Sequence, residues 1–308
     1  MSLVPWGYTE PFTTVRDWGP TMKRATVLWL LATVAAAPAS GQPAPAKTVK
    51  AQDLTDAEME AFLAKGKIGR TRGVGAGVTG STRATLRHRD LEHDAHIQSI
   101  DLTQPLGKMI GGVEIDFRDS FRHNVAAYRL DRLLGLGMVP VTVVRSFEQK
   151  TSAFTWWVDD VVMTEAQRRE QKVEAPDPEA WNREMYAVRI FDQLIYNFDR
   201  NLGNLLIDSS WRIWMIDHTR AFKIFKELKD PANLRYRCPR GLLEALRRLD
   251  RPKLDGAMRG LLGSGQSAGI LARRDLIVRY FDGRIAEIGE AEVLYDLPPR
   301  LTARPGPP

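Results

Sequence analysis

Alternating apolar and polar residues mark the first half of the chain, and helically spaced apolar residues mark most of the second half. The alternation predicts strands over residues 82–86, 91–100, 140–145 and 154–162. Helical spacing predicts helices over residues 119–134, 164–174, 178–198, 240–249, 253–262 and 268–288. A capping box at Thr55 predicts an earlier helix that ends near Ala64. Strands followed by helices predict an α+β fold, with a small antiparallel sheet and then a mostly helical region.

The most informative chemistry lies in residues 190–222, where Asp199, Asn204 and Asp217 follow one another at intervals of five and thirteen positions. A phosphotransferase needs such a set: one Asp positions the attacking hydroxyl, while the Asn and the second Asp hold Mg²⁺ on the phosphates. Short apolar strands are predicted between them, at 204–207 and 213–216. Singly, each residue also fits an ordinary turn, and for Asp199 that reading stays open.

A glycine-rich segment precedes the first predicted strand. Gly75, Gly77 and Gly80 fit the spacing G-x-G-x-x-G, which lets backbone amides approach phosphate oxygens. The segment leads into a strand and not a helix, so it suits a loop that covers phosphates better than a dinucleotide-binding turn. A simple hairpin turn would have the same composition.

Trp157 and Val158 lie where a segment joining sheet and helices would offer backbone groups to adenine. The alternative is that adjacent Trp residues point to opposite faces of one strand, one of them into the core. His93 and His96 have a spacing that could bind a metal, but a structural role is favoured because no third ligand is evident.

The segments 197–204 and 215–222 resemble those of the atypical kinases: the phosphatidylinositol 3-/4-kinases, the HipA-type bacterial kinases and the secretory-pathway, Golgi casein-kinase-like family. Residues 121–135 are similar to the helix that carries the N-lobe glutamate of the secretory-pathway kinases, and 236–238 to that family's C-terminal end. The resemblance spans about 52–296. It implies a two-lobed, protein-kinase-like fold that uses ATP with Mg²⁺ or Mn²⁺.

The resemblance also predicts two departures. Most kinases pair a strand lysine with a helix glutamate to hold the phosphates, and the alignment puts Gln104 and Asn124 at these positions. Lys108 is a substitute candidate for the cation, and Glu114 for the carboxylate. Three hypotheses remain: a phosphotransferase that moves the γ-phosphate to a hydroxyl, a pseudokinase that binds without transfer, or an enzyme that transfers AMP. The acceptor, whether protein, lipid or small molecule, is not identified.

The ends of the chain bear on its location. A signal peptide is predicted by three features: a basic start at Met22, a short apolar run and an A-x-A site. The protein is then expected to be extracytoplasmic, that is, periplasmic or secreted. The alternative is that the segment is not cleaved and anchors the protein. The run is too short for an ordinary membrane span. The predicted organisation is an upstream and signal segment (1–41), a linker (42–51), an N-lobe (52–160), a C-lobe (161–296) and a disordered tail (297–308).

Composition narrows the set of partners. The net charge is +6 and the basic residues are dispersed, which argues against a nucleic-acid partner and leaves a monomer as the simplest expectation. The single cysteine, Cys238, excludes an intrachain disulfide, and we expect it to be buried in the core.

Overall fold

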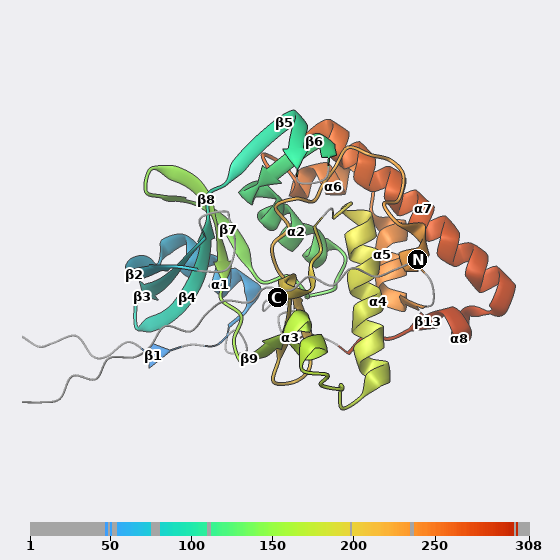
Figure 1. Ribbon diagram of the computed structural model, residues 1–308, viewed down its shortest axis with the longest axis horizontal. Helices are drawn as coiled ribbons and strands as arrows, with labels where there is room; N and C mark the ends of the chain where they lie inside the picture. The colour runs from blue at the N-terminus through green and yellow to red at the C-terminus, as the bar shows by residue number, and fades with distance from the viewer. Residues whose placement is uncertain are drawn as a thin grey trace, which may run out of the picture. The chain divides into compact units, whose positions relative to one another are not determined.

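An antiparallel sheet followed by a mostly helical region makes up the protein (Figure 1). The computed structural model describes residues 47–48, 50, 54–74, 81–109, 112–197, 199–234, 237–298 and 300. All of these belong to one compact unit, Ala44–Pro308. The predicted signal segment, the glycines Gly75, Gly77 and Gly80, and the end of the predicted tail lie outside the described residues. The α+β fold class predicted from the sequence is confirmed.

The main sheet has the strand order β2–β3–β4–β8–β7, with every neighbour antiparallel, and a short β1 pairs parallel with β4. Its strands are β1 (Lys47–Thr48), β2 (Lys67–Gly73), β3 (Thr82–His88), β4 (Leu91–Gln98), β7 (Thr142–Phe147) and β8 (Lys150–Trp156). Ala84 and Leu86 of β3 and Ala95 and Ile97 of β4 are buried, so this face of the sheet contributes to the core.

Two helices pack against this sheet, α1 (Asp56–Lys65) and α2 (Phe121–Leu133). Helix α1 begins with the predicted capping box: Thr55 and Glu58 satisfy each other's backbone amides. Ser120 caps α2 by accepting a hydrogen bond from the Arg122 amide. Most of α2 is buried, including Asn124, so this helix brings polar side chains into the interior.

A hairpin that the sequence pattern did not predict stands between β4 and α2. Its strands, β5 (Asp101–Met109) and β6 (Gly112–Ser120), form a separate two-stranded sheet (Figure 1). Leu102, Leu106 and Ile115 on it are exposed. Apolar residues on this hairpin are exposed, and they do not form a regular apolar–polar alternation in the sequence. The periodicity of the sequence therefore did not predict these two strands.

The helical region contains a small sheet, β9 (Val161–Thr164), β10 (Leu205–Asp208) and β11 (Ile213–Met215), in the order β11–β10–β9. Its helices are α3 (Glu165–Glu170), α4 (Pro178–Leu194), α5 (Arg240–Arg248), α6 (Arg251–Ala257), α7 (Ser264–Ile288) and α8 (Glu290–Val293). The remaining elements are the 3₁₀ turns η2 (Leu202–Asn204) and η3 (Pro231–Leu234) and the paired β12 (Cys238–Pro239) and β13 (Leu294–Tyr295).

Backbone conformation explains two differences from the predicted boundaries. The strand predicted over 154–162 is divided into β8 and β9, because Asp160 between them has φ of +54°. Helix α4 ends before Tyr196, which has φ of +50°, and so is shorter than predicted. One apolar cluster joins the sheet to the helices, and Cys238 is fully buried in it, as expected.

Candidate functional site

A cleft of about 350 Å³ lies between the sheet and the helical region. Its described lining includes Asn204 and Asp217 together with Trp157 and Val158. The structure therefore brings the predicted metal ligands and the predicted adenine-binding segment to one cavity. The other lining residues are Val74, Ser81, His96, Asn124, Val139, Pro140, Thr142, Thr155, Trp156, Val161, Thr164, Gly203, Leu206, Met215, Ile216 and His218.

The loop that carries Asp199 and Asn204 is held by Arg200. The Arg200 guanidinium binds the Asp192 carboxylate of α4 through Nε at 2.9 Å and a terminal nitrogen at 3.0 Å. A further nitrogen donates to the carbonyls of Asn204 at 3.2 Å and Ile216 at 2.8 Å. One side chain therefore ties the end of α4, the loop and the segment before Asp217 together.

Asp217 follows β11 and is fixed beside Asn204 by backbone pairing. The Ile216 amide donates to the Asn204 carbonyl at 3.0 Å, and the Thr219 hydroxyl donates to Asp217 Oδ1 at 3.1 Å. Asp217 has φ of +52°, a left-handed conformation that costs a non-glycine residue on the order of 1 kcal/mol or more. Such strain persists where surrounding contacts impose it, and Asp217 lines the cleft.

Asp199 is exposed, and its amide donates to Asn197 Oδ1 at 3.2 Å. Its charge acts on the buried carboxyl of Asp119, as does the charge of Asp217. Asp199 and Asp217 therefore lie close to the same third acid. This exposed position suits a group that would receive an acceptor hydroxyl.

Both tryptophans of the predicted hinge line the cleft, and Trp156 is also part of the core. Trp156 is 3% exposed and stacks on His93, with ring centroids 3.8 Å apart. Trp157 lines the cleft, and the Arg83 guanidinium lies 4.0 Å from its ring centroid. His93 also bonds the Asp159 carboxylate at 2.8 Å, which fits the structural role favoured for it.

Gln104 and Asn124, which the alignment puts at the lysine and glutamate positions, lie on separate elements, and no hydrogen bond joins them in the structure. Gln104 is exposed on the β5–β6 hairpin, whereas Asn124 of α2 bonds Gln98 of β4, with Asn124 Nδ2 2.7 Å from Gln98 Oε1. Asn124 Oδ1 accepts from the His218 amide at 2.7 Å, next to Asp217. Asn124 therefore joins β4 to the segment that carries Asp217 through neutral amide hydrogen bonds.

His96, two residues before Gln98 on β4, also lines the cleft. Burial lowers the pKa of its imidazole, and the charge of Asp217 acts in the opposite direction. His96 is therefore mostly neutral at pH 7. The described lining of the cleft contains no lysine or arginine. Lys108 lies on β5 opposite Val113 near the end of the hairpin, and its side chain lies outside the described part.

Asp119, at the end of β6, is a buried acid near Asp217 that the sequence did not single out. Its side chain is 8% exposed, and burial raises the pKa of its carboxyl. The negative charges of Asp217 and Asp199 act in the same direction, while Thr219 and Arg220 oppose the rise. The sequence pattern predicted only that Asp119 begins a helix, because its partners are nearly 100 positions away.

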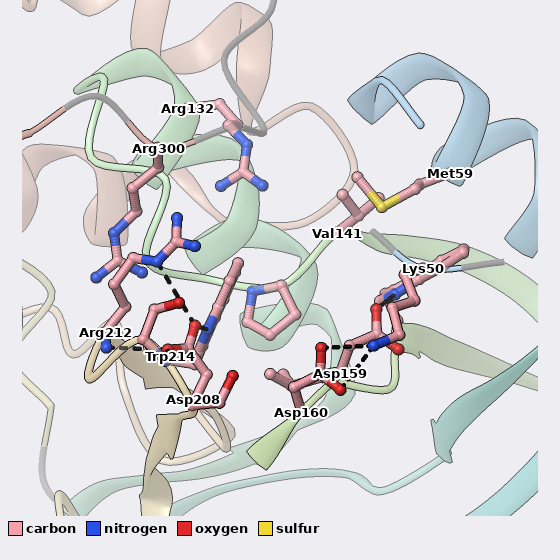
Figure 2. Close-up of a pocket in the computed structure, with 15 residues that line it drawn as sticks. Lys50, Met59, Arg132, Val141, Asp159, Asp160, Asp208, Arg212, Trp214 and Arg300 are labelled. Atoms are coloured by element: carbon pink, nitrogen blue, oxygen red, sulfur yellow. Dashed lines mark hydrogen bonds and ion pairs between the residues drawn. The ribbon is translucent and has the colours of Figure 1, made fainter. Parts of the chain in front are cut away.

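A second cavity, of about 120 Å³, is shown in Figure 2, and its lining shares Trp156 and Val158 with the lining of the cleft. Each of its four cationic side chains has a carboxylate partner: Lys50 with Asp160, Arg132 with Asp56 and Asp131, Arg212 with Asp208, and Arg300 with Glu184. No cation on this lining is left in excess to attract phosphate.

The donors in the cleft fit a hard divalent cation, because an amide oxygen and a carboxylate suit Mg²⁺ or Mn²⁺. Within the described ranges, no group of three or more His, Cys, Asp or Glu side chains is placed to hold a metal by itself. A metal at Asn204 and Asp217 therefore depends on phosphate oxygens for further ligands. Along the part of the chain that the structure describes, no helix is long and apolar enough to cross a membrane.

Two solved kinase structures have a similar fold. The structure of hydra Fam20 with sugar matches with a TM-score of 0.59 at 14% identity, over 78% of this chain and 92% of that chain. The Golgi casein kinase with Mn/ADP bound matches with a TM-score of 0.58 at 13% identity, over 79% and 80%. No protein-family profile and no curated protein sequence matches. The fold is that of the atypical kinases, as the sequence resemblance predicted.

Proposed function

We propose that this protein is a phosphotransferase that moves the γ-phosphate of ATP to a hydroxyl acceptor with Mg²⁺ or Mn²⁺. The observation that carries the proposal is the convergence of Asn204 and Asp217 in one cleft, which the segment Trp157–Val158 also lines. The Mn/ADP complex of a structural neighbour supports the choice of nucleotide and metal.

Each residue has a distinct role in this proposal. Trp157, Val158 and Leu206 form an apolar part of the cleft that suits adenine. Asn204 and Asp217 hold the metal, which offsets phosphate charge when bound. Asp199 orients the acceptor hydroxyl and accepts its proton. The acceptor oxygen bonds to the γ-phosphorus, the bond to the bridging oxygen breaks, and ADP leaves.

A second candidate, a pseudokinase, is favoured by one observation. Gln98 and Asn124 form a neutral pair where most kinases hold phosphates with a charged lysine. A protein of this kind would bind nucleotide and metal with little or no transfer. Because neither Gln98 nor Asn124 is charged, this pair leaves no buried charge unpaired. The pair is therefore compatible with a stable fold in a phosphotransferase and in a pseudokinase.

We further propose that the protein acts outside the cytoplasm, as the basic and apolar segment after Met22 predicts. The secretory setting of the neighbouring Golgi casein kinase supports this location. On this proposal the predicted lobes, 52–160 and 161–296, enclose the cleft. Protein, lipid and small-molecule hydroxyls all remain candidate acceptors.

The test is transfer from [γ-³²P]ATP in Mg²⁺ or Mn²⁺, scored as autophosphorylation and as labelling of added acceptors. The parent protein should transfer label, and Asp217→Ala should abolish transfer and metal-dependent nucleotide binding. Asp90→Ala, in the exposed turn between β3 and β4, is the matched control and should behave as the parent. Nucleotide binding without transfer would favour the pseudokinase, and label from the α position would indicate AMP transfer.

A further inference from the structure

Helix α7 presents one buried polar face to residues 222–229, a stretch without helix or strand that follows Asp217 and is called the contact segment below. Gln266, Gly269 and Arg273 are spaced by three and four positions, so they lie on the same face of the helix, and all three are buried. Buried polar side chains need hydrogen-bond partners. The partners of this face therefore show what it holds.

The partners are backbone carbonyls of the contact segment. Gln266 Nε2 donates to the Phe222 carbonyl at 2.9 Å. Arg273 donates from Nη1 to the carbonyl of Lys223, at 3.2 Å, and to that of Phe225. Because the contact segment has no helix or ladder of its own, these two side chains take the place of secondary structure for its backbone.

Gly269 lets α7 approach the contact segment closely. A Cβ atom at Gly269 would lie 2.9 Å from Arg273 Nη1 and 3.0 Å from the carbonyl oxygens of Lys223 and Phe225. These distances are well inside ordinary van der Waals contact. An alanine would therefore push the helix and the contact segment apart or displace the guanidinium, so the glycine and the arginine serve the same contact.

Arg273 is an unusual choice for a core position. Its side chain is fully buried, and its described hydrogen bonds all go to backbone carbonyls and none to a carboxylate. In the part of the chain that the structure describes, its Nη2 atom has no partner. Burial lowers the pKa of the guanidinium to about 10, so it is still charged at pH 7. A buried charge without a carboxylate is unfavourable, which indicates a role that an apolar side chain would not fill.

The contacts of Arg273 and of the contact segment extend to the loop of Asp199. Arg273 Nε donates to the carbonyl of Leu194, the last residue of α4, at 2.7 Å. Lys229, at the end of the contact segment, donates from Nζ to the Asn197 carbonyl at 3.2 Å, and Asn197 Oδ1 accepts the Asp199 amide. The contact segment is therefore bonded to the side of the site where the acceptor hydroxyl is proposed to bind.

We propose that Gln266, Gly269 and Arg273 form a clamp on α7 that positions the contact segment, and with it the loop of Asp199, for the acceptor hydroxyl. This inference rests on the proposed function, because it assigns the acceptor side of that site to the contact segment. Arg273 is a positioning residue, since its described hydrogen bonds reach no residue that is proposed to hold nucleotide or metal. Loss of the clamp should therefore impair transfer and leave nucleotide affinity unchanged.

Hydrogen–deuterium exchange of the full chain tests the clamp without relying on catalysis. Arg273→Met should speed exchange of the contact-segment amides by about tenfold or more, while the amides of β3, β4 and β8 exchange as in the parent. Gly269→Ala keeps the arginine and should have the same local effect, which covers the case in which Arg273→Met does not fold.

Two variants of α7 are matched controls. Arg274→Met removes the neighbouring arginine, which donates to the Leu249 carbonyl instead. Gly283→Ala adds a Cβ atom that meets nothing within 4 Å. Both should leave the contact segment as protected as in the parent.

Transfer and nucleotide affinity separate positioning from general stability. A misplacement of about 1 Å can cost about 10²-fold in rate, so Arg273→Met should lower single-turnover transfer from [γ-³²P]ATP by about that factor with unchanged Mn-ADP affinity. Arg273→Lys keeps the charge but loses the forked donor geometry, and it should recover only part of the protection and of the transfer. A merely structural arginine would instead lose transfer and nucleotide affinity together and raise exchange across the whole chain.

Parental exchange of the contact segment in both Arg273→Met and Gly269→Ala would overturn the inference. Parental transfer by a variant whose contact segment is deprotected would overturn it as well. Both results would leave the proposed function standing, because the parent would still transfer label. If the parent transfers no label, the proposed function fails, and the exchange experiment still decides whether the clamp holds the contact segment.

Discussion

Replacement of Arg200 should weaken both the fold and the site, because this side chain links three of its parts. Arg200 and its partner Asp192 are each 11% exposed, and Arg200→Met would leave the Asp192 carboxylate with only the Asn197 amide group, at 2.9 Å. Loss of one partner from a buried ion pair costs about 3–5 kcal/mol. At about 2–4 °C per kcal/mol for a chain of this size, the melting temperature should fall by about 6–20 °C.

Urea unfolding followed by tryptophan fluorescence measures this loss, and titration with Mn-ADP measures its effect on the site. The matched control is Arg183→Met, which breaks the exposed α4 pair between Arg183 and Glu179. Exposed pairs of this kind contribute less than about 1 kcal/mol. The double variant Arg200→Met with Asp192→Asn should be more stable than Arg200→Met, because no unpaired charge remains.

Equal losses for Arg200→Met and Arg183→Met would refute this reasoning. Unchanged Mn-ADP affinity in a folded Arg200→Met variant would show that the carbonyl contacts to Asn204 and Ile216 do not position the proposed metal ligands.

Two further predictions concern groups at the cleft. Gln98→Lys with Asn124→Glu should tighten Mg-ATP binding and raise transfer if the neutral pair limits the protein, as measured by nucleotide titration; unchanged affinity would contradict this. Burial lowers the pKa of His123 to about 4 from an ordinary value near 6.5, so the unfolded chain binds the proton first as pH falls. The free energy of unfolding should therefore fall below pH 6.5, and at pH 5 it should be about 2 kcal/mol lower than at pH 7. Urea unfolding at both pH values measures this loss, which should be smaller in His123→Gln than in the parent.

The loop and hairpin that carry Asp199, Asn204 and Asp217 were predictable because their geometry is local. A helix end, a turn and two short strands within thirty residues fix how these side chains approach each other. The kinase-like fold followed from the same segment. Local spacing therefore carried most of the functional information in the sequence.

The partner of Asn124 could not be found in this way. The alignment used Pro105 as a marker, but Pro105 lies on the unpredicted β5–β6 hairpin, whereas Asn124 bonds Gln98 of β4. Strand β4 is fixed by long-range pairing with β8, where Gln98 lies opposite Ala153. Such pairing leaves no trace in a short window of sequence.

The burial of Asp119 was not predicted for a related reason. Its sequence neighbours suggest only the start of a helix, while its position near Asp217 depends on the contact between Ser120 and Thr219. Burial of a single acid among other acids is a property of the tertiary structure.

The most direct test of phosphotransfer is a comparison of the parent with Asp199→Asn. Transfer from [γ-³²P]ATP is measured under single-turnover conditions, and Mn-ADP affinity is measured on the same samples. A positioned acid–base group contributes about 10²–10⁴-fold, so transfer should fall by that factor while affinity stays unchanged. Equal transfer by parent and variant would contradict the role of Asp199, and no transfer by the parent would contradict the proposed function itself.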